Sequence, residues 1–135
     1  MEEVMIAGGK GRLGMYGSCF YLAWTPGVQV DTGDAVASIE AMRALGGGRE
    51  LPLLVDIAGV TMSAAARGAY ERAEAVSAVA LLGSSVVDTV VAAALGRHGF
   101  CPHAYFTSRS EAMAWLQGLE LPELAAGEEL GFRNA

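Results

Sequence analysis

The spacing of hydrophobic positions changes at about residue 31. Before that point, short apolar runs at residues 4–7 and 15–25 flank a glycine-rich segment, and residues 28–30 follow a Pro-Gly turn signal. The run at 15–25 is rich in aromatic residues, which favour strands. We therefore predict an N-terminal β-hairpin or meander in which residues 8–14 form the turn.

After this region, apolar residues recur every three or four positions, as in amphipathic helices. Asp31 or Thr32 is predicted to cap a helix that reaches about residue 45 and ends at three glycines. Ser63 is predicted to cap a second helix, to about residue 75. The apolar stripes expected to face the core are Val36, Ile39, Met42 and Leu45 in the first helix and Ala65, Ala69, Ala73 and Val76 in the second.

Continuous apolar runs between the helices predict strands at residues 51–58, 76–82 and 103–107. The predicted order is a β-hairpin followed by α-β-α-β-α-β-α, which indicates a mostly parallel sheet with right-handed crossovers. The third helix is expected to turn Val87, Val90, Val91, Ala94 and Leu95 inward. The fourth begins with a capping box of Ser108 and Glu111 and is expected to bury Ala112, Trp115 and Leu116.

The length of 135 residues and the hydrophobic fraction of 53% fit one domain with a core of its own. From residue 119 the sequence becomes acidic and loses its regular pattern. We therefore expect an α/β domain over residues 1–118. Residues 119–135 are expected to form an acidic tail, docked or partly disordered.

Charge and cysteine content exclude several classes of protein. The net charge is −6 and Lys10 is the only lysine, whereas nucleic-acid binding needs basic residues that neutralise phosphates. Cys19 and Cys101 lie in apolar stretches and are too few for a disulfide framework, so we expect reduced thiols. The acidic N-terminus lacks a signal-peptide pattern, which favours a cytoplasmic protein.

Residues 75–96 are long and apolar enough to imitate a membrane span. The glycine and two serines at residues 83–85, however, indicate a turn followed by a helix cap. Asp88 would also place a charge inside a lone span. We therefore expect a strand and a helix here, and no membrane span.

One stretch, residues 53–61, resembles the STAS domain of bacterial anti-sigma factor antagonists and sulfate transporters. It reads Leu-Leu-Val-Asp-Ile-Ala-Gly-Val-Thr, with Asp56, Gly59 and Thr61 at the positions that match the antagonists. The turn that follows departs from that family, because Ser63 is its only hydroxyl and no Asp-Ser pair is present. The chain is also similar to bacterial STAS/SEC14-type domains of unknown function.

This resemblance implies a mixed sheet with helices packed mainly on one face. It also implies a regulatory or protein-interaction module, phospho-switched by a kinase or an anti-sigma-type regulator, and a homodimer. SEC14-type relatives bind lipids in an apolar cavity, so a small-molecule or lipid carrier is the alternative function. An enzyme of unrecognised type is a further alternative.

The residues expected to carry function lie where strands end and helices begin. Ser63, Ser84 and Ser85 are the candidates for phosphorylation or anion binding, because phosphate suits a helix N-terminus. Crevices in open α/β sheets form beyond the carboxyl ends of strands. The predicted edge of a binding pocket therefore consists of Asp56, Gly59, Thr61 and Gly83. The simpler interpretation of the serines is that they are ordinary helix caps.

Other motifs give weaker signals. Residues 9–14 match GxGxxG, but a strand-like segment follows where dinucleotide binding needs a helix. His98, Cys101 and His103 form His-x-x-Cys-x-His, although no fourth ligand for zinc is in view. The alternation of a strand would point Cys101 and His103 the same way. No nucleophile motif is present, so we predict no catalytic residues, metal or cofactor, while Asp56 or the two histidines would serve an enzyme.

Overall fold

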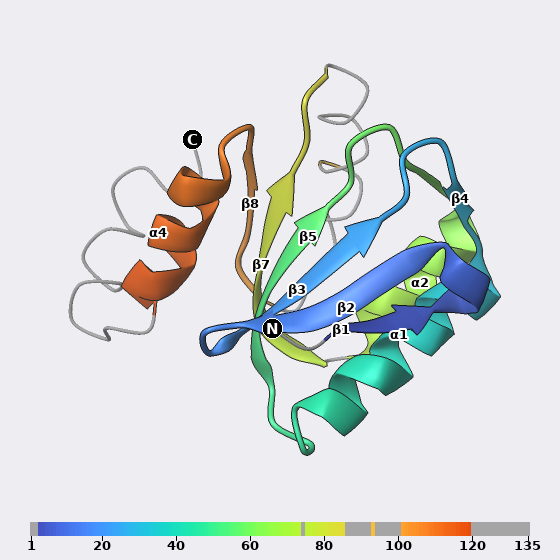
Figure 1. Cartoon of the computed structure of the whole chain (residues 1–135), viewed down its shortest axis with the longest axis horizontal. Helices are drawn as coiled ribbons and strands as arrows, with labels where there is room; N and C mark the ends of the chain where they lie inside the picture. Colours follow the sequence, from blue (N-terminus) through green and yellow to red (C-terminus); the bar gives the residue numbers. More distant parts are fainter. Residues whose placement is uncertain (1–2, 74, 86–92, 94–100, 120–135) are drawn as a thin grey trace.

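The computed structural model describes residues 3–73, 75–85, 93 and 101–119. Its centre is a six-stranded sheet in the order β1-β2-β3-β5-β7-β8 (Figure 1). The strands are β1 (Glu3–Ile6), β2 (Gly11–Tyr16), β3 (Cys19–Trp24), β5 (Leu51–Asp56), β7 (Val76–Leu82) and β8 (His103–Phe106). The first three pair antiparallel, and β3, β5, β7 and β8 are parallel. The predicted mixed, mostly parallel α/β sheet is confirmed.

The helices of the described chain cover both faces of this sheet. They are α1 (Thr32–Leu45), α2 (Ala64–Ala73) and α4 (Arg109–Leu119), with a short 3-10 turn, η1 (Ala7–Gly9). Helices α1 and α2 lie together on one face, and α4 lies on the other (Figure 1). Beside this sheet, β4 (Gln29–Val30) and β6 (Thr61–Met62) form a separate parallel pair.

The N-terminal turn is shorter than predicted. Gly8 and Gly9 make it with positive φ angles of 66° and 93°, whereas residues 11–14 belong to β2. Gly11 lies within β2, and the Trp24 indole covers it. A Cβ at Gly11 would stand 2.8 Å from Trp24 Cε3. The run at 15–25 is accordingly divided between β2 and β3.

Helix α1 begins where its capping residues predict. The Asp34 amide donates to Asp31 Oδ1, and the Asp31 amide donates to Asp34 Oδ2, both at 3.0 Å. The predicted inner stripe is only half correct, because Val36 and Leu45 are exposed. The stripe that faces the core contains Ala35, Ser38, Ile39 and Met42. Ala35 thus takes the place predicted for Val36, which lies about 100° further around the helix axis.

Helix α2 is capped by Ser63, whose Oγ accepts from the Ala66 amide at 3.1 Å. Ala66 and Ala69 are buried, whereas Ala65, predicted to face inward, is exposed. The helix ends at Ala73, and the expected continuation of its stripe belongs to β7.

Helix α4 agrees with its prediction. Ser108 Oγ accepts from the Glu111 amide at 3.4 Å, and Ala112, Trp115 and Leu116 are buried against the sheet. The predicted third helix, with its inward residues Val87, Val90, Val91, Ala94 and Leu95, lies outside the described residues except for residue 93. The acidic tail lies outside them from residue 120.

The first part of the segment that imitates a membrane span is strand β7. Among the described residues, no helix has the length and apolar character that crossing a bilayer requires.

Candidate functional site

A cavity of about 80 Å³ lies between the sheet and the pair α1 and α2. Its floor comes from alternate residues of β3, β5 and β7, which are Leu22, Trp24, Leu53, Val55, Val79 and Leu81. Its walls come from the two helices, through Ile39, Met42, Tyr70 and Ala73. At its ends lie Ile57, Met62, Ala75, Val76, Cys101 and His103.

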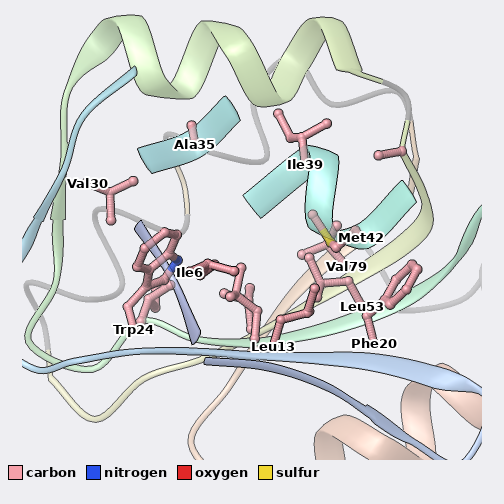
Figure 2. Close-up of a cluster of buried hydrophobic side chains, with 14 of the residues drawn as sticks. Ile6, Leu13, Phe20, Trp24, Val30, Ala35, Ile39, Met42, Leu53 and Val79 are labelled. Carbon is pink, nitrogen blue, oxygen red and sulfur yellow. The ribbon is translucent and has the colours of Figure 1, made fainter. Parts of the chain in front are cut away.

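The cavity follows from the sizes of the side chains that meet in this layer. Figure 2 shows Leu53 and Val79 below Met42 of α1, and Trp24 further along the sheet, below Val30. Two small residues, Ala73 at the end of α2 and Ala75 after it, border the cavity. Alanines leave room that the neighbouring side chains do not fill.

Tyr70, which lines the cavity, belongs to an ordered pair of hydroxyls with Ser38. Ser38 Oγ lies 2.6 Å from the Tyr70 hydroxyl and donates its proton to the Ala35 carbonyl at 2.8 Å. Because a serine has one hydroxyl proton, Tyr70 is the donor to Ser38. Burial raises the pKa of the Tyr70 phenol above its usual value, and the Asp34 carboxylate adds to that shift. Tyr70 is therefore neutral at physiological pH.

The indole of Trp24 forms another part of the wall. Trp24 is 3% exposed, and its Nε1 has no hydrogen-bond acceptor among the described residues. Buried N–H groups normally have a partner, so an orphaned donor beside a cavity is a feature that calls for an explanation.

Cys101 and His103 both line the cavity, although Cys101 precedes β8 and does not take part in its alternation. The Cys101 carbonyl lies 2.8 Å from His103 Nδ1, which must carry the proton because a carbonyl only accepts. Burial raises the pKa of the Cys101 thiol, and the Glu50 carboxylate raises it further. A protonated thiol is a poor nucleophile. His98, the third member of the motif, lies outside the described residues.

The predicted pocket edge has local structural roles. Asp56 Oδ1 accepts from the Ala58 amide at 3.0 Å, which forms an Asx turn after β5. Gly59 adopts a φ of 70°, and its carbonyl accepts from the Gly27 amide at 2.8 Å. Thr61 is exposed in β6, where it pairs with Gln29.

The three candidate serines differ in their environment. Ser63 is half-buried and acts as the cap of α2. Ser84 and Ser85 are exposed beyond β7, next to the buried Gly83, whose amide donates to the Phe106 carbonyl at 3.0 Å. The ends of β5 and β7 lie side by side, because Asp56 pairs with Leu82. Asp56 and Gly83 therefore lie at the same edge of the sheet.

Sequence reasoning did not single out Trp24, Ser38 or Tyr70. A usable signal existed for Tyr70, because it is the one phenol in the alanine-rich helix α2. Trp24 gave a weaker signal, as the last residue of a strand before Pro26. Their proximity to the cavity could not be inferred from spacing, because Ser38 and Tyr70 are 32 positions apart.

Comparison with known proteins gives a family and a fold. Residues 17–120 match the model of a domain of unknown function, DUF7793. No curated protein matches the chain. The chain is similar in structure to an uncharacterized protein of the DUF3478 family, with a SpoIIAA-like fold, from Shewanella loihica PV-4. The TM-score is 0.56 at 17% identity, with 86% of this chain and 96% of that chain covered.

At this identity, the structural likeness shows the fold alone. It confirms the STAS-like fold that the sequence stretch at residues 53–61 indicated. The family model covers most of the chain, and the chain therefore belongs to the DUF7793 family of domains of unknown function.

Proposed function

We propose that this domain is a binding module, not an enzyme, and that it takes up a small apolar molecule in the cavity beneath α1 and α2. The observation that carries the proposal is the cavity itself, about 80 Å³ of space walled mainly by aliphatic and aromatic side chains. Ligand sites of proteins are typically concave, apolar and supplied with a few polar groups. Tyr70 and Trp24 supply such groups here.

The size of the cavity limits the ligand. An engineered apolar cavity of about 150 Å³ stays dry and binds benzene. This cavity has about half that volume, so it suits a molecule smaller than benzene, such as a chain of three carbon atoms. Two side chains of the cavity could act as nucleophiles, the Tyr70 phenol and the Cys101 thiol, and both have raised pKa values. A raised pKa keeps these groups protonated, which favours a binding role over a catalytic one.

Titration with dissolved propane tests the proposal. A ligand that binds only the folded state raises stability by RT ln(1 + [L]/Kd), so the melting temperature of the protein should rise with propane. Ala73→Leu, which fills the cavity wall, should abolish the rise. Ala64→Leu is the matched control, because Ala64 is an exposed residue of the same helix and does not line the cavity.

The control should respond to propane like the parent protein. If neither the parent nor Ala64→Leu is stabilised, the cavity does not take up apolar molecules and the proposal is wrong. Equal stabilisation of Ala73→Leu would place the binding site elsewhere.

A second candidate is the regulatory, protein-interacting module that the STAS-like fold suggests. The observation in its favour is the exposure of Ser84 and Ser85 at the carboxyl edge of the sheet. The partner would be a kinase or an anti-sigma-type regulator, and the domain would act as a homodimer. Ser63 is a poorer target for phosphorylation, because it is half-buried whereas Ser84 and Ser85 are exposed.

Native mass spectrometry of protein recovered gently from its own cells tests this candidate. We expect dimers with phosphate on Ser84 or Ser85. A spectrum of unmodified monomers would contradict it, and a retained small molecule would favour the cavity function instead.

A further inference from the structure

The indole N–H of Trp24 indicates which class of ligand the cavity takes. Among the described residues that line the cavity, Trp24 is the one with a buried side-chain N–H that lacks an acceptor. An N–H removed from water without a new partner is costly, and folded proteins rarely tolerate it. A bound molecule with an acceptor atom would satisfy this donor.

The packing around the indole shows which way its N–H edge faces. The benzo edge, through Cε3 and Cζ3, lies against Gly11 of β2. Nε1 is at the opposite edge of the ring system. In the sheet, β2 and β5 lie on opposite sides of β3, and the cavity floor continues from Trp24 onto Val55 and Leu81 of β5 and β7. The N–H edge is therefore on the side of β3 where the cavity lies.

The other polar groups of the cavity define what else the ligand can carry. No described residue that lines the cavity is a lysine, arginine, aspartate or glutamate. Among these residues only His103 could offer an anionic group a counter-charge, and burial of a charge is costly, so an uncharged ligand is favoured. Tyr70 donates its proton to Ser38, so it supplies no second donor.

We propose that the cavity selects an uncharged apolar molecule with one oxygen acceptor, such as a ketone, an aldehyde or an ester. Its oxygen accepts the hydrogen bond of Trp24 Nε1, and its hydrocarbon part fills the space between Leu53 and Tyr70. This inference rests on the proposed apolar binding function. It adds the recognition of a carbonyl group and the residue that performs it.

A pair of probes of similar size, propane and acetone, tests the apolar binding function and the recognition of a carbonyl group separately. The first readout is the indole Nε1–H resonance of Trp24 by nuclear magnetic resonance, assigned with Trp115→Phe. Acetone should move this resonance downfield, and propane should not produce a hydrogen-bond shift. This measurement uses the unsubstituted protein and does not depend on the folding of a variant.

The second readout is the ratio of the two affinities in the parent protein and in Trp24→Phe. A neutral hydrogen bond changes affinity by about threefold to tenfold. The preference for acetone over propane should fall by that factor in Trp24→Phe. The affinity of Trp24→Phe for propane serves as the reference for any change in cavity shape.

The outcomes distinguish the inference from the function on which it rests. Binding of both probes with an unmoved Trp24 resonance and an unchanged affinity ratio would overturn carbonyl recognition and leave the apolar cavity function intact. Failure of both probes to bind would overturn the cavity function and the inference together. A downfield shift and a lost preference in Trp24→Phe would support both.

Discussion

The two faces of the central sheet are packed in opposite ways. On the face covered by α4, the sheet contributes several alanines, Ala23, Ala78 and Ala80, beside the larger Tyr21 and Leu54, and the helix contributes the large Trp115 and Leu116. On the face covered by α1 and α2, the sheet contributes large residues, and several inward helix residues are alanines. The cavity is on this second face.

This difference shows that packing depends on the sizes of both partners of an interface. The alanines of the sheet leave room for the bulky side chains of α4. On the other face, the side chains of Ile39, Met42 and Tyr70 fill only part of the space above the larger sheet residues. The cavity on one face and its absence from the described part of the other thus depend on how the side chains of helix and sheet match in size.

The largest expected contrast comes from two adjacent leucines of β5. Leu54 is fully buried against α4, and Leu53 borders the cavity. Leucine-to-alanine changes in cores cost about 2–5 kcal/mol. We expect about 4 kcal/mol for Leu54→Ala and about 2 kcal/mol for Leu53→Ala, because a side chain beside a void has fewer contacts to lose. Urea denaturation measures the free energy of unfolding of both variants. Equal costs would mean that the two faces of the sheet do not differ in packing at β5.

A smaller contrast comes from adding volume to β7. Ala80 is fully buried beneath α4, so Ala80→Val should destabilise the protein by about 1–3 kcal/mol through overpacking. Val79 points into the cavity, so the extra methylene of Val79→Ile should be neutral or stabilise by up to about 0.8 kcal/mol. Melting curves at fixed pH compare the two variants. A loss of stability in Val79→Ile would mean that the cavity side has no usable space.

The sequence predicted the features that depend on local chemistry. Turn and periodicity signals predicted the order of the main described strands and helices. Cap signals predicted Asp31, Ser63 and Ser108. The inward residues of α4 were also correct, because their bulk and their spacing agree.

The errors fall where small residues occupy the core. In α1 the inward positions include Ala35 and Ser38, while the more hydrophobic Val36 and Leu45 are exposed. Hydrophobicity alone therefore selected the wrong stripe. The cavity was not predictable either, because it depends on the fit of side chains from distant segments.

The smallest contrast concerns the N-termini of the helices on the two faces. The start of α1 is ionic, because Asp34 completes the capping box and forms an ion pair with Lys10. Burial opposes ionisation of Asp34, but Lys10 and the Asp31 amide outweigh it, so the pKa of Asp34 lies below its usual 3.8. The start of α4 is capped by the uncharged hydroxyl of Ser108.

A lowered pKa in the folded state stabilises the protein above the unfolded value of about 4, and this stabilisation is lost as the pH falls through the folded value. Asp34→Asn should therefore cost about 1 kcal/mol at pH 7, and the cost should shrink as the pH falls below 4. Ser108→Ala is the control, with a cost of about 0.5–1 kcal/mol that does not change with pH. Urea denaturation of both variants between pH 7 and pH 3 measures the difference. A constant cost for Asp34→Asn would mean that shape and hydrogen bonding hold the start of α1, and that its charge does not distinguish the two faces.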